Sequence, residues 1–185
     1  MNTSLTFITG NAAKAEQLSR HLDFPVTHQK LDLPEIQSLD LAEIVEHKAK
    51  EAFKHVGSLV LVEDTSLQFN ALGRLPGPLI KWFLTELDNE GLCKLLIGYQ
   101  DRSAYAEVVF GLYDGKELKT YSGSIQGSIA NIPKGDRGFG WDPIFIPEGS
   151  IKTWGEMTVE EQKETSMRRI ALKKLQADLL TTQHS

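Results

Sequence analysis

Two adjacent carboxylates close an apolar segment of the chain, Leu59-Val60-Leu61-Val62-Glu63-Asp64-Thr65. Four aliphatic residues in a row predict a strand that is covered on both faces. A carboxylate at the end of such a strand is costly to remove from water unless a cation meets it. Successive strand residues point to opposite faces, so Glu63 and Asp64 are not expected to enter the same cleft. One of them is therefore a candidate metal ligand or general base.

A second polar group follows the first predicted strand, in the segment Thr9-Gly10-Asn11-Ala12-Ala13-Lys14. The segment falls at a strand-to-helix turn, where free backbone N–H groups and the positive end of the helix dipole favour an anion. Gly10 permits close approach to the backbone, and Lys14 adds a charge. The alternative is that Asn11 only caps the helix, and the spacing does not decide between the two. The Walker and dinucleotide glycine patterns are both absent here.

Lys48 occupies an unusual position for a charged residue. It lies four residues after Ile44 and four before Ala52, on or beside the apolar stripe of a helix predicted from Asp40 to about His55. Its stem may follow the apolar surface while the amine reaches water, as lysines often do. The functional alternative is an inward lysine that meets an anion.

The segment 134–142 combines three glycines with two large aromatic residues, Phe139 and Trp141. Stacking on a planar base is one explanation for such rings in a loop, and a local hydrophobic plug is the other. Farther along, Arg168 and Arg169 fall in the first turn of a predicted helix, where they oppose the helix dipole. They are either solvated or hold a polyanion. A nucleotide polyphosphate with a divalent ion would explain all these features together.

Composition limits the remaining possibilities. The chain has 185 residues, of which 41% are hydrophobic and 24% charged, as expected of an ordinary globular domain. No apolar run approaches the roughly 18 residues that span a bilayer, and no secretory signal is evident, so a cytoplasmic protein without a membrane partner is expected. The net charge of −5 argues against a nucleic-acid partner. The single cysteine, Cys93, excludes an intrachain disulfide and is expected to be a small buried hydrophobe.

The hydrophobic pattern predicts an α/β fold with a mixed sheet. Strands are expected at residues 5–9, 26–29, 59–62, 104–113, 117–121 and 124–130, the fourth and fifth forming a hairpin across Asp114-Gly115. Helices are expected at residues 12–22, 40–55, 79–87 and 90–97, in a short segment after a capping box at Thr158–Glu161, and from Ser166 to about Leu180.

The chain resembles the inosine triphosphate pyrophosphatase family, which removes non-canonical purine nucleotides, and it is most similar to the eukaryotic-type members. Matching segments follow one another in the same order over nearly the whole chain: residues 7–14, 32–37, 61–65, 69–73, 75–78, 80–83, 103–106 and 139–143. The resemblance implies a hydrolase of nucleotide metabolism that converts ITP, dITP and XTP to the monophosphate and pyrophosphate with Mg²⁺. It also implies a homodimer, and a single domain over residues 1–185 with an elongated mixed sheet, flanking helices and an active-site cleft between two lobes.

The resemblance also implies roles for individual residues. Glu35 and Asp64 would bind the metal, and Asp64 would also be the catalytic base for the attacking water. The substrate-binding residues would be Thr9, Gly10, Asn11, Ala12, Ala13 and Lys14 at the phosphates, with Lys48, Asp64, Thr65 and Lys81, and Phe139, Gly140, Trp141, Asp142, Met167 and Arg168 around the base and sugar.

Two positions depart from the family pattern. Met167 stands where the family usually has histidine, and a thioether does not donate or accept as imidazole does. The family's phosphate-binding lysine aligns with Gln162 without a gap and with Lys163 after a shift of one residue. One residue is about 100° of helix, so only one of them can face the site, and Lys163 is preferred on chemical grounds.

Two other functions are compatible with the same residues. A non-catalytic nucleotide-binding or sensing module would bind ITP and release no pyrophosphate. A different nucleotide phosphohydrolase would release orthophosphate instead.

Overall fold

The computed structural model describes residues 5–10, 15, 18, 19, 22, 24–138 and 140–182. The strands are β1 (Leu5–Ile8), β2 (Val26–Gln29), β3 (Val60–Phe69), β4 (Pro76–Gly77), β5 (Ser103–Tyr113), β6 (Leu118–Ile129) and β7 (Phe145–Pro147). The α-helices are α2 (Leu41–Val56), α3 (Ile80–Lys94), α4 (Val159–Glu164) and α5 (Met167–Thr182). Single 3-10 turns occur at Asn70–Leu72, Asp142–Ile144 and Trp154–Glu156.

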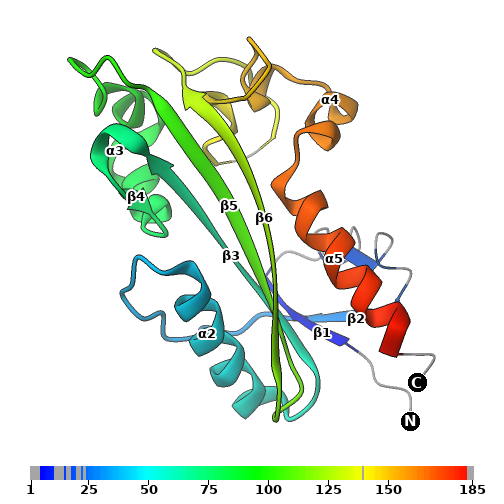
Figure 1. The fold of residues 1–185 in the computed structure, drawn as a ribbon. Coiled ribbons are helices and arrows are strands. Elements are labelled where there is room, and N and C mark those ends of the chain that lie inside the picture. Colours follow the sequence, from blue (N-terminus) through cyan, green and yellow to red (C-terminus); the bar gives the residue numbers. More distant parts are fainter. Residues whose placement is uncertain are drawn as a thin grey trace. The chain divides into compact units, whose positions relative to one another are not determined.

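The strands form one seven-stranded mixed sheet in the order β2-β1-β3-β5-β6-β7, with β4 paired to β3 (Figure 1). β1 pairs parallel to β2 and β3, whereas β4 and β7 pair antiparallel to β3 and β6. Helices flank this sheet, so the predicted α/β class with a mixed sheet is confirmed.

The chain divides into two compact units. Unit 1 contains Met1–Asp64, Val108–Gly123 and Ile170–Ser185, and unit 2 contains Thr65–Glu107 and Ser124–Arg169. Strands β3, β5 and β6 contribute residues to both units, because each is longer than the part assigned to either one. The cleft that the family resemblance implies between two lobes remains a prediction.

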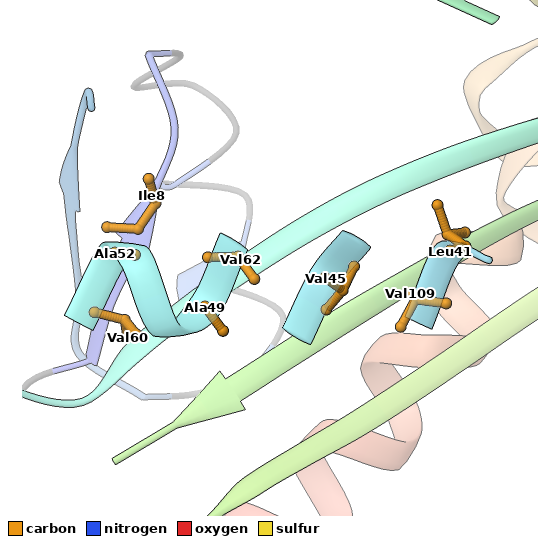
Figure 2. Packing of buried hydrophobic residues seen from close by; sticks show 8 residues of the cluster. All are labelled: Ile8, Leu41, Val45, Ala49, Ala52, Val60, Val62 and Val109. Atoms are coloured by element: carbon orange, nitrogen blue, oxygen red, sulfur yellow. The ribbon is translucent and has the colours of Figure 1, made fainter. Parts of the chain in front are cut away.

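The core of unit 1 lies between α2 and strands β1, β3 and β5 (Figure 2). Helix α2 begins because the Asp40 carboxylate accepts hydrogen bonds from the backbone N–H groups of Ala42 and Glu43, which confirms the predicted cap. It ends at Gly57, whose left-handed backbone (φ 67°) suits glycine. The cluster consists of Ile8, Leu41, Val45, Ala49, Ala52, Val60, Val62 and Val109.

The C-terminal helix covers the opposite side of these strands in unit 1 (Figure 1). Asp178 of α5 accepts hydrogen bonds from Lys119 (3.0 Å) and from the hydroxyl of Tyr121 (2.8 Å), both on β6. These two donors lower the pKa of the Asp178 carboxyl. Lys174, also on α5, donates to the backbone carbonyl of Ser122 at 2.6 Å, so α5 is attached to β6 at several points.

Most predicted elements are present, and the main differences concern strand length. The strand expected at residues 59–62 continues to Phe69, because its second half pairs with β4, so Glu63 and Asp64 lie within a strand and not at its end. The strands expected at 117–121 and 124–130 are one continuous strand, β6. The predicted helices 79–87 and 90–97 are two segments of α3 that meet at a kink, where Asp88 has φ 54°.

Other sequence predictions are met or fall on residues outside the described set. The capping box is present, since Glu161 N–H donates to Thr158 and the Glu161 carboxylate accepts from Thr158 N–H. Cys93 is buried, and burial raises its thiol pKa to about 11, so it behaves as an inert hydrophobe. The predicted helix 12–22 lies largely outside the described residues. No helix in the described part of the chain is both long and apolar enough to cross a membrane.

Close packing of Gly111 on β5 against α2 gives a test of this core. A Cβ atom at Gly111 would lie 2.5 Å from Val45 Cγ1 and 3.3 Å from Val62 Cγ2. We expect Gly111→Ala to lower the free energy of unfolding by about 1–3 kcal/mol through overpacking. In a Val45→Ala background, which removes the clashing methyl, the same change should cost at least about 1 kcal/mol less. Urea unfolding of the four proteins measures this coupling, and additive effects would contradict the packing described.

Candidate functional site

An acidic site in unit 1 joins three of the predicted residues. The Lys48 ammonium on α2 lies 3.5 Å from Asp64 Oδ2 on β3 and 3.5 Å from Glu35 Oε1 in the loop before α2. It also donates to the backbone carbonyl of Glu63 at 3.2 Å. Both carboxylate oxygens are near the same nitrogen, so they are separated by no more than twice that distance. Lys48 therefore turns inward, and the anions that it meets are carboxylates of the protein.

Strand alternation explains which of the two adjacent acids takes part. Asp64 places its carboxylate beside Lys48, whereas Glu63 contributes only its backbone carbonyl to that ammonium. The Asp64 side chain retains 20% of its exposure and that of Glu35 retains 44%. Asp64 is thus shielded by the strand and by α2, while Glu35 stands at the more open side of the pair.

The donor set of the acidic site fits a hard divalent cation. Carboxylate oxygens are the protein ligands that Mg²⁺ prefers, and this ion typically takes one or two of them together with phosphate oxygens and water. Glu35 and Asp64 supply two. Within the described residues, no three or more Asp, Glu, His or Cys side chains are grouped to hold a metal by themselves. The site therefore suits an ion that arrives with a phosphate better than a permanent structural metal.

Unit 2 contains an aromatic cavity of about 170 Å³. It is lined by residues from β3, from the segments around Trp141 and Trp154, and from α4 and α5: Thr65, Trp141, Asp142, Trp154, Gln162, Ser166, Met167 and Arg168. Thr65, Trp141, Asp142, Met167 and Arg168 among these were predicted from the sequence. A planar ring bounded by aromatic walls, with a few polar groups, is a plausible occupant of such a space.

The aromatic rings of this cavity pack on one another. The centroid of Trp141 lies 5.5 Å from that of Trp154 and 5.8 Å from that of Phe145, and Trp154 lies 4.5 Å from Phe145. The Trp154 indole N–H donates to Thr165 at 2.8 Å, which fixes its ring. Trp141 therefore belongs to a hydrophobic cluster and also lines the cavity, so the two interpretations of its ring are compatible.

Gln162, and not Lys163, lines the cavity. The Gln162 amide donates to the backbone carbonyl of Trp154 at 2.6 Å, which directs its side chain toward the aromatic cluster. Lys163 is exposed and does not line this space. The choice of Lys163 from the sequence was made on charge alone, and the helical rotation of one residue places the neutral amide inward.

The two arginines at the start of α5 have different surroundings. Arg169 donates to the Glu164 carboxylate at 2.9 Å and to the backbone carbonyl of Lys163 at 3.3 Å. Arg168 lines the cavity, and burial lowers its guanidinium pKa from 12.5 to about 10. Arg168 still carries its charge at neutral pH. Ser166 accepts a hydrogen bond from the backbone N–H of Arg169, as expected of the helix cap.

The remaining predicted residues are only partly described. Thr9 and Gly10 end β1, and the aliphatic stem of Lys30 lies within 3.3 Å of where a Cβ atom of Gly10 would be. Asn11, Ala12, Ala13, Lys14 and Phe139 lie outside the described residues. Lys81 is exposed at the start of α3, with its ammonium 5.4 Å from the ring centroid of its neighbour Trp82, and it does not line the cavity. Gly140 is exposed and has a left-handed backbone (φ 65°).

Sequence reasoning missed Trp154 as a cavity residue. A signal was present in Thr153-Trp154-Gly155-Glu156, which fits the capping-box pattern. Both reciprocal bonds of that box are formed, and the Thr153 hydroxyl also donates to the carbonyl of Lys134 at 2.7 Å. The box therefore holds the 3-10 turn that carries Trp154 against the glycine-rich loop.

Comparison with known proteins agrees with this arrangement of elements. A family model described as the Ham1 family matches residues 5–178. The chain belongs to the Ham1 family. The inosine triphosphate pyrophosphatase resemblance found in the sequence is thereby confirmed, whereas its eukaryotic-type detail stays a prediction.

Solved structures of Ham1 relatives share the fold over nearly their whole length. The Ham1 protein of Staphylococcus aureus has a TM-score of 0.87 and 27% identity, covering 97% of this chain and 99% of its own. A Ham1 protein of Coxiella burnetii has a TM-score of 0.84 and 25% identity, covering 96% and 98%. The nucleoside-triphosphatase / dITP/XTP pyrophosphatase of Mycobacterium abscessus has a TM-score of 0.77 and 29% identity, covering 93% and 98%.

The altered pKa of Arg168 gives a test of the cavity in this Ham1 family member. A guanidinium whose folded pKa lies below 12.5 is disfavoured by folding, and the penalty is fully present at neutral pH because both pKa values are far above it. We expect Arg168→Met to leave the melting temperature unchanged or higher. Arg169→Met, which removes the bonds to Glu164 and Lys163, should lower it slightly. Thermal unfolding of both variants measures this, and a larger loss for Arg168→Met would show that Arg168 supports the fold.

Proposed function

We propose that this chain is a pyrophosphatase of non-canonical purine nucleoside triphosphates, which hydrolyses ITP, dITP and XTP to the monophosphate and pyrophosphate. The observation that carries the proposal is the acidic site of Glu35, Lys48 and Asp64 in a member of the Ham1 family. The Mycobacterium abscessus relative, which bears the name dITP/XTP pyrophosphatase, supports the choice of substrates.

Asp64 is the residue that would take a proton from the attacking water. Its carboxylate is partly shielded from solvent and held in place by Lys48 at 3.5 Å, so its position is fixed before the substrate arrives. Glu35 and Asp64 would together hold Mg²⁺. When bound, this ion would polarise the phosphate and offset its charge.

Lysines would stabilise the negative charge that grows on the phosphates as the bond to the α-phosphorus breaks. Lys48 is already next to the proposed base. Lys14 and Lys163 keep this role as predictions. Lys81 is assigned to the nucleotide by the family resemblance.

The aromatic cavity of unit 2 would accept the purine base. Trp141 and Trp154 offer flat apolar surfaces, while Asp142 and Arg168 provide polar groups. Phe139 and Gly140 join this loop by family resemblance. Donors aimed at a 6-oxo group would reject adenine, which presents an amino group there, and such a site can discriminate by roughly 10⁴–10⁵.

The proposal includes three further attributes. The enzyme would require Mg²⁺, act as a homodimer and work in the cytoplasm. The family resemblance supports the first two, and the sequence, in which no secretory signal is evident, supports the third.

Removal of the proposed base tests the mechanism. We expect Asp64→Asn to reduce turnover of ITP by at least about 10²-fold, because the amide cannot accept the proton of the water. The dissociation constant for ITP should change far less, since the side chain keeps its shape. Turnover is measured by pyrophosphate release and binding by calorimetry, with Glu63→Gln as the matched control on the opposite strand face. Near-normal turnover of Asp64→Asn would refute the assignment.

The same assay over ITP, XTP, GTP and ATP tests the function itself. Pyrophosphate release that favours ITP and XTP is the expected outcome. Binding without release would indicate a sensing module, and orthophosphate release would indicate a different phosphohydrolase.

Met167 tests how the cavity selects the base. It is buried in the cavity wall, where imidazole would add a donor and an acceptor that a thioether lacks. We expect Met167→His to change the ratio of ITP to GTP turnover by at least about threefold, because one new hydrogen bond is worth about 1 kcal/mol. Ile170→His, on the same helix and exposed, is the control. Identical ratios in the parent and in Met167→His would exclude Met167 from selection.

A further inference from the structure

The glycine-rich loop of residues 134–143 is anchored at several points within unit 2. Lys134 N–H donates to the carbonyl of Pro143 at 2.8 Å, and Arg137 N–H donates to that of Gly155 at 3.1 Å. Close to the cavity residues Trp141 and Asp142, the anchor is a side chain. Asn89 on α3 donates from Nδ2 to the carbonyl oxygen of Gly140 at 2.9 Å.

The backbone around both partners is arranged for this contact. Asp88 has a positive φ of 54°, and its carboxylate accepts a hydrogen bond from Gly91 N–H, so a new helical segment begins at Asn89. Gly140 has φ 65°, which glycine adopts readily. Leu84, one helical turn earlier on α3, lies 3.8 Å from where a Cβ atom of Gly140 would be. Helix α3 thus contacts Gly140 from two side chains.

This hydrogen bond controls the direction of the next peptide group. A trans peptide is planar, with its carbonyl and its N–H pointing in opposite directions. Fixing the carbonyl of Gly140 therefore fixes the direction of Trp141 N–H and the path of the backbone into Trp141 and Asp142. Both of these residues line the aromatic cavity.

Stability alone does not account for Asn89. Its Oδ1 atom is buried and has no hydrogen-bond partner among the described residues. An unpaired buried acceptor is unfavourable, and asparagine is a weak helix former. The residue is therefore better explained by the donor that it directs at Gly140.

We propose that Asn89 is a positioning residue for base selection, which acts by holding the Gly140–Trp141 peptide so that Trp141 and Asp142 keep their places in the cavity. The proposal rests on the proposed function for its consequence in catalysis. The hydrogen bond to Gly140 and the cavity lining belong to the fold itself.

Asn89→Asp is the decisive variant because it replaces the donor by a carboxylate facing the Gly140 carbonyl. We expect the KM for ITP to rise roughly tenfold, with kcat changed less than about threefold and the preference for ITP over GTP reduced. Asn89→Ala should show the same pattern more weakly. The matched control is Asn70→Ala, which loses one 2.8 Å bond from Asn70 to Ser103 away from the loop and should behave as the parent. A fall in kcat with unchanged KM and selectivity, or kinetics equal to those of Asn70→Ala, would overturn the proposal.

A second measurement needs no substrate. The chain has three tryptophans, of which Trp82 is exposed and Trp141 and Trp154 are buried. In a Trp82→Phe background, acrylamide quenching of fluorescence should increase in Asn89→Asp and not in Asn70→Ala. Unchanged quenching in Asn89→Asp would refute the anchoring of the loop. If the parent fails to hydrolyse ITP, the proposed function fails, while this result still decides the role of Asn89.

Discussion

One ammonium group holds together residues that are distant in the sequence. Lys48 lies 3.5 Å from both Glu35 and Asp64, and its partners come from a loop and a strand that meet only because α2 packs on the sheet. That packing depends on small and branched side chains, Val45, Ala49 and Ala52, which bring the helix backbone close to β1, β3 and β5 (Figure 2). The same apolar stripe turns Lys48 inward. Because Lys48 offsets the charge of two carboxylates, they can remain together where a divalent ion and a phosphate would need them.

The aromatic cavity of unit 2 follows a different physical logic. Its walls are rings that pack on one another, and its shape is held by hydrogen bonds that reach backbone atoms: Gln162 to Trp154, Thr153 to Lys134 and Asn89 to Gly140. The family's usual histidine and lysine are replaced by Met167 and, in the ungapped alignment, by Gln162. The cavity therefore holds a thioether and a neutral amide, and Arg168 supplies its cation, with a pKa that burial lowers to about 10.

Local patterns in the sequence were sufficient for the elements and for part of the site. The apolar run before Glu63 and Asp64 predicted the buried strand, and alternation correctly separated the two acids. The end of that strand was wrong, because the pairing of Leu67 and Gln68 with β4 depends on a segment eight or more residues away. Lys163 was preferred over Gln162 because charge was weighed without knowing how α4 is rotated. Asn89 carried no sequence signal, since its importance comes from a contact with Gly140, 51 residues away.

The central claim is that Asp64 directs water to the α-phosphorus of a purine nucleoside triphosphate. Hydrolysis of ITP in water enriched in oxygen-18 tests it most directly, with mass spectrometry of both products. The account predicts that the label enters inosine monophosphate and that the released pyrophosphate is unlabelled. Label in pyrophosphate would place the attack at the β-phosphorus, and labelled orthophosphate would place it at the γ-phosphorus. Either result would contradict the account.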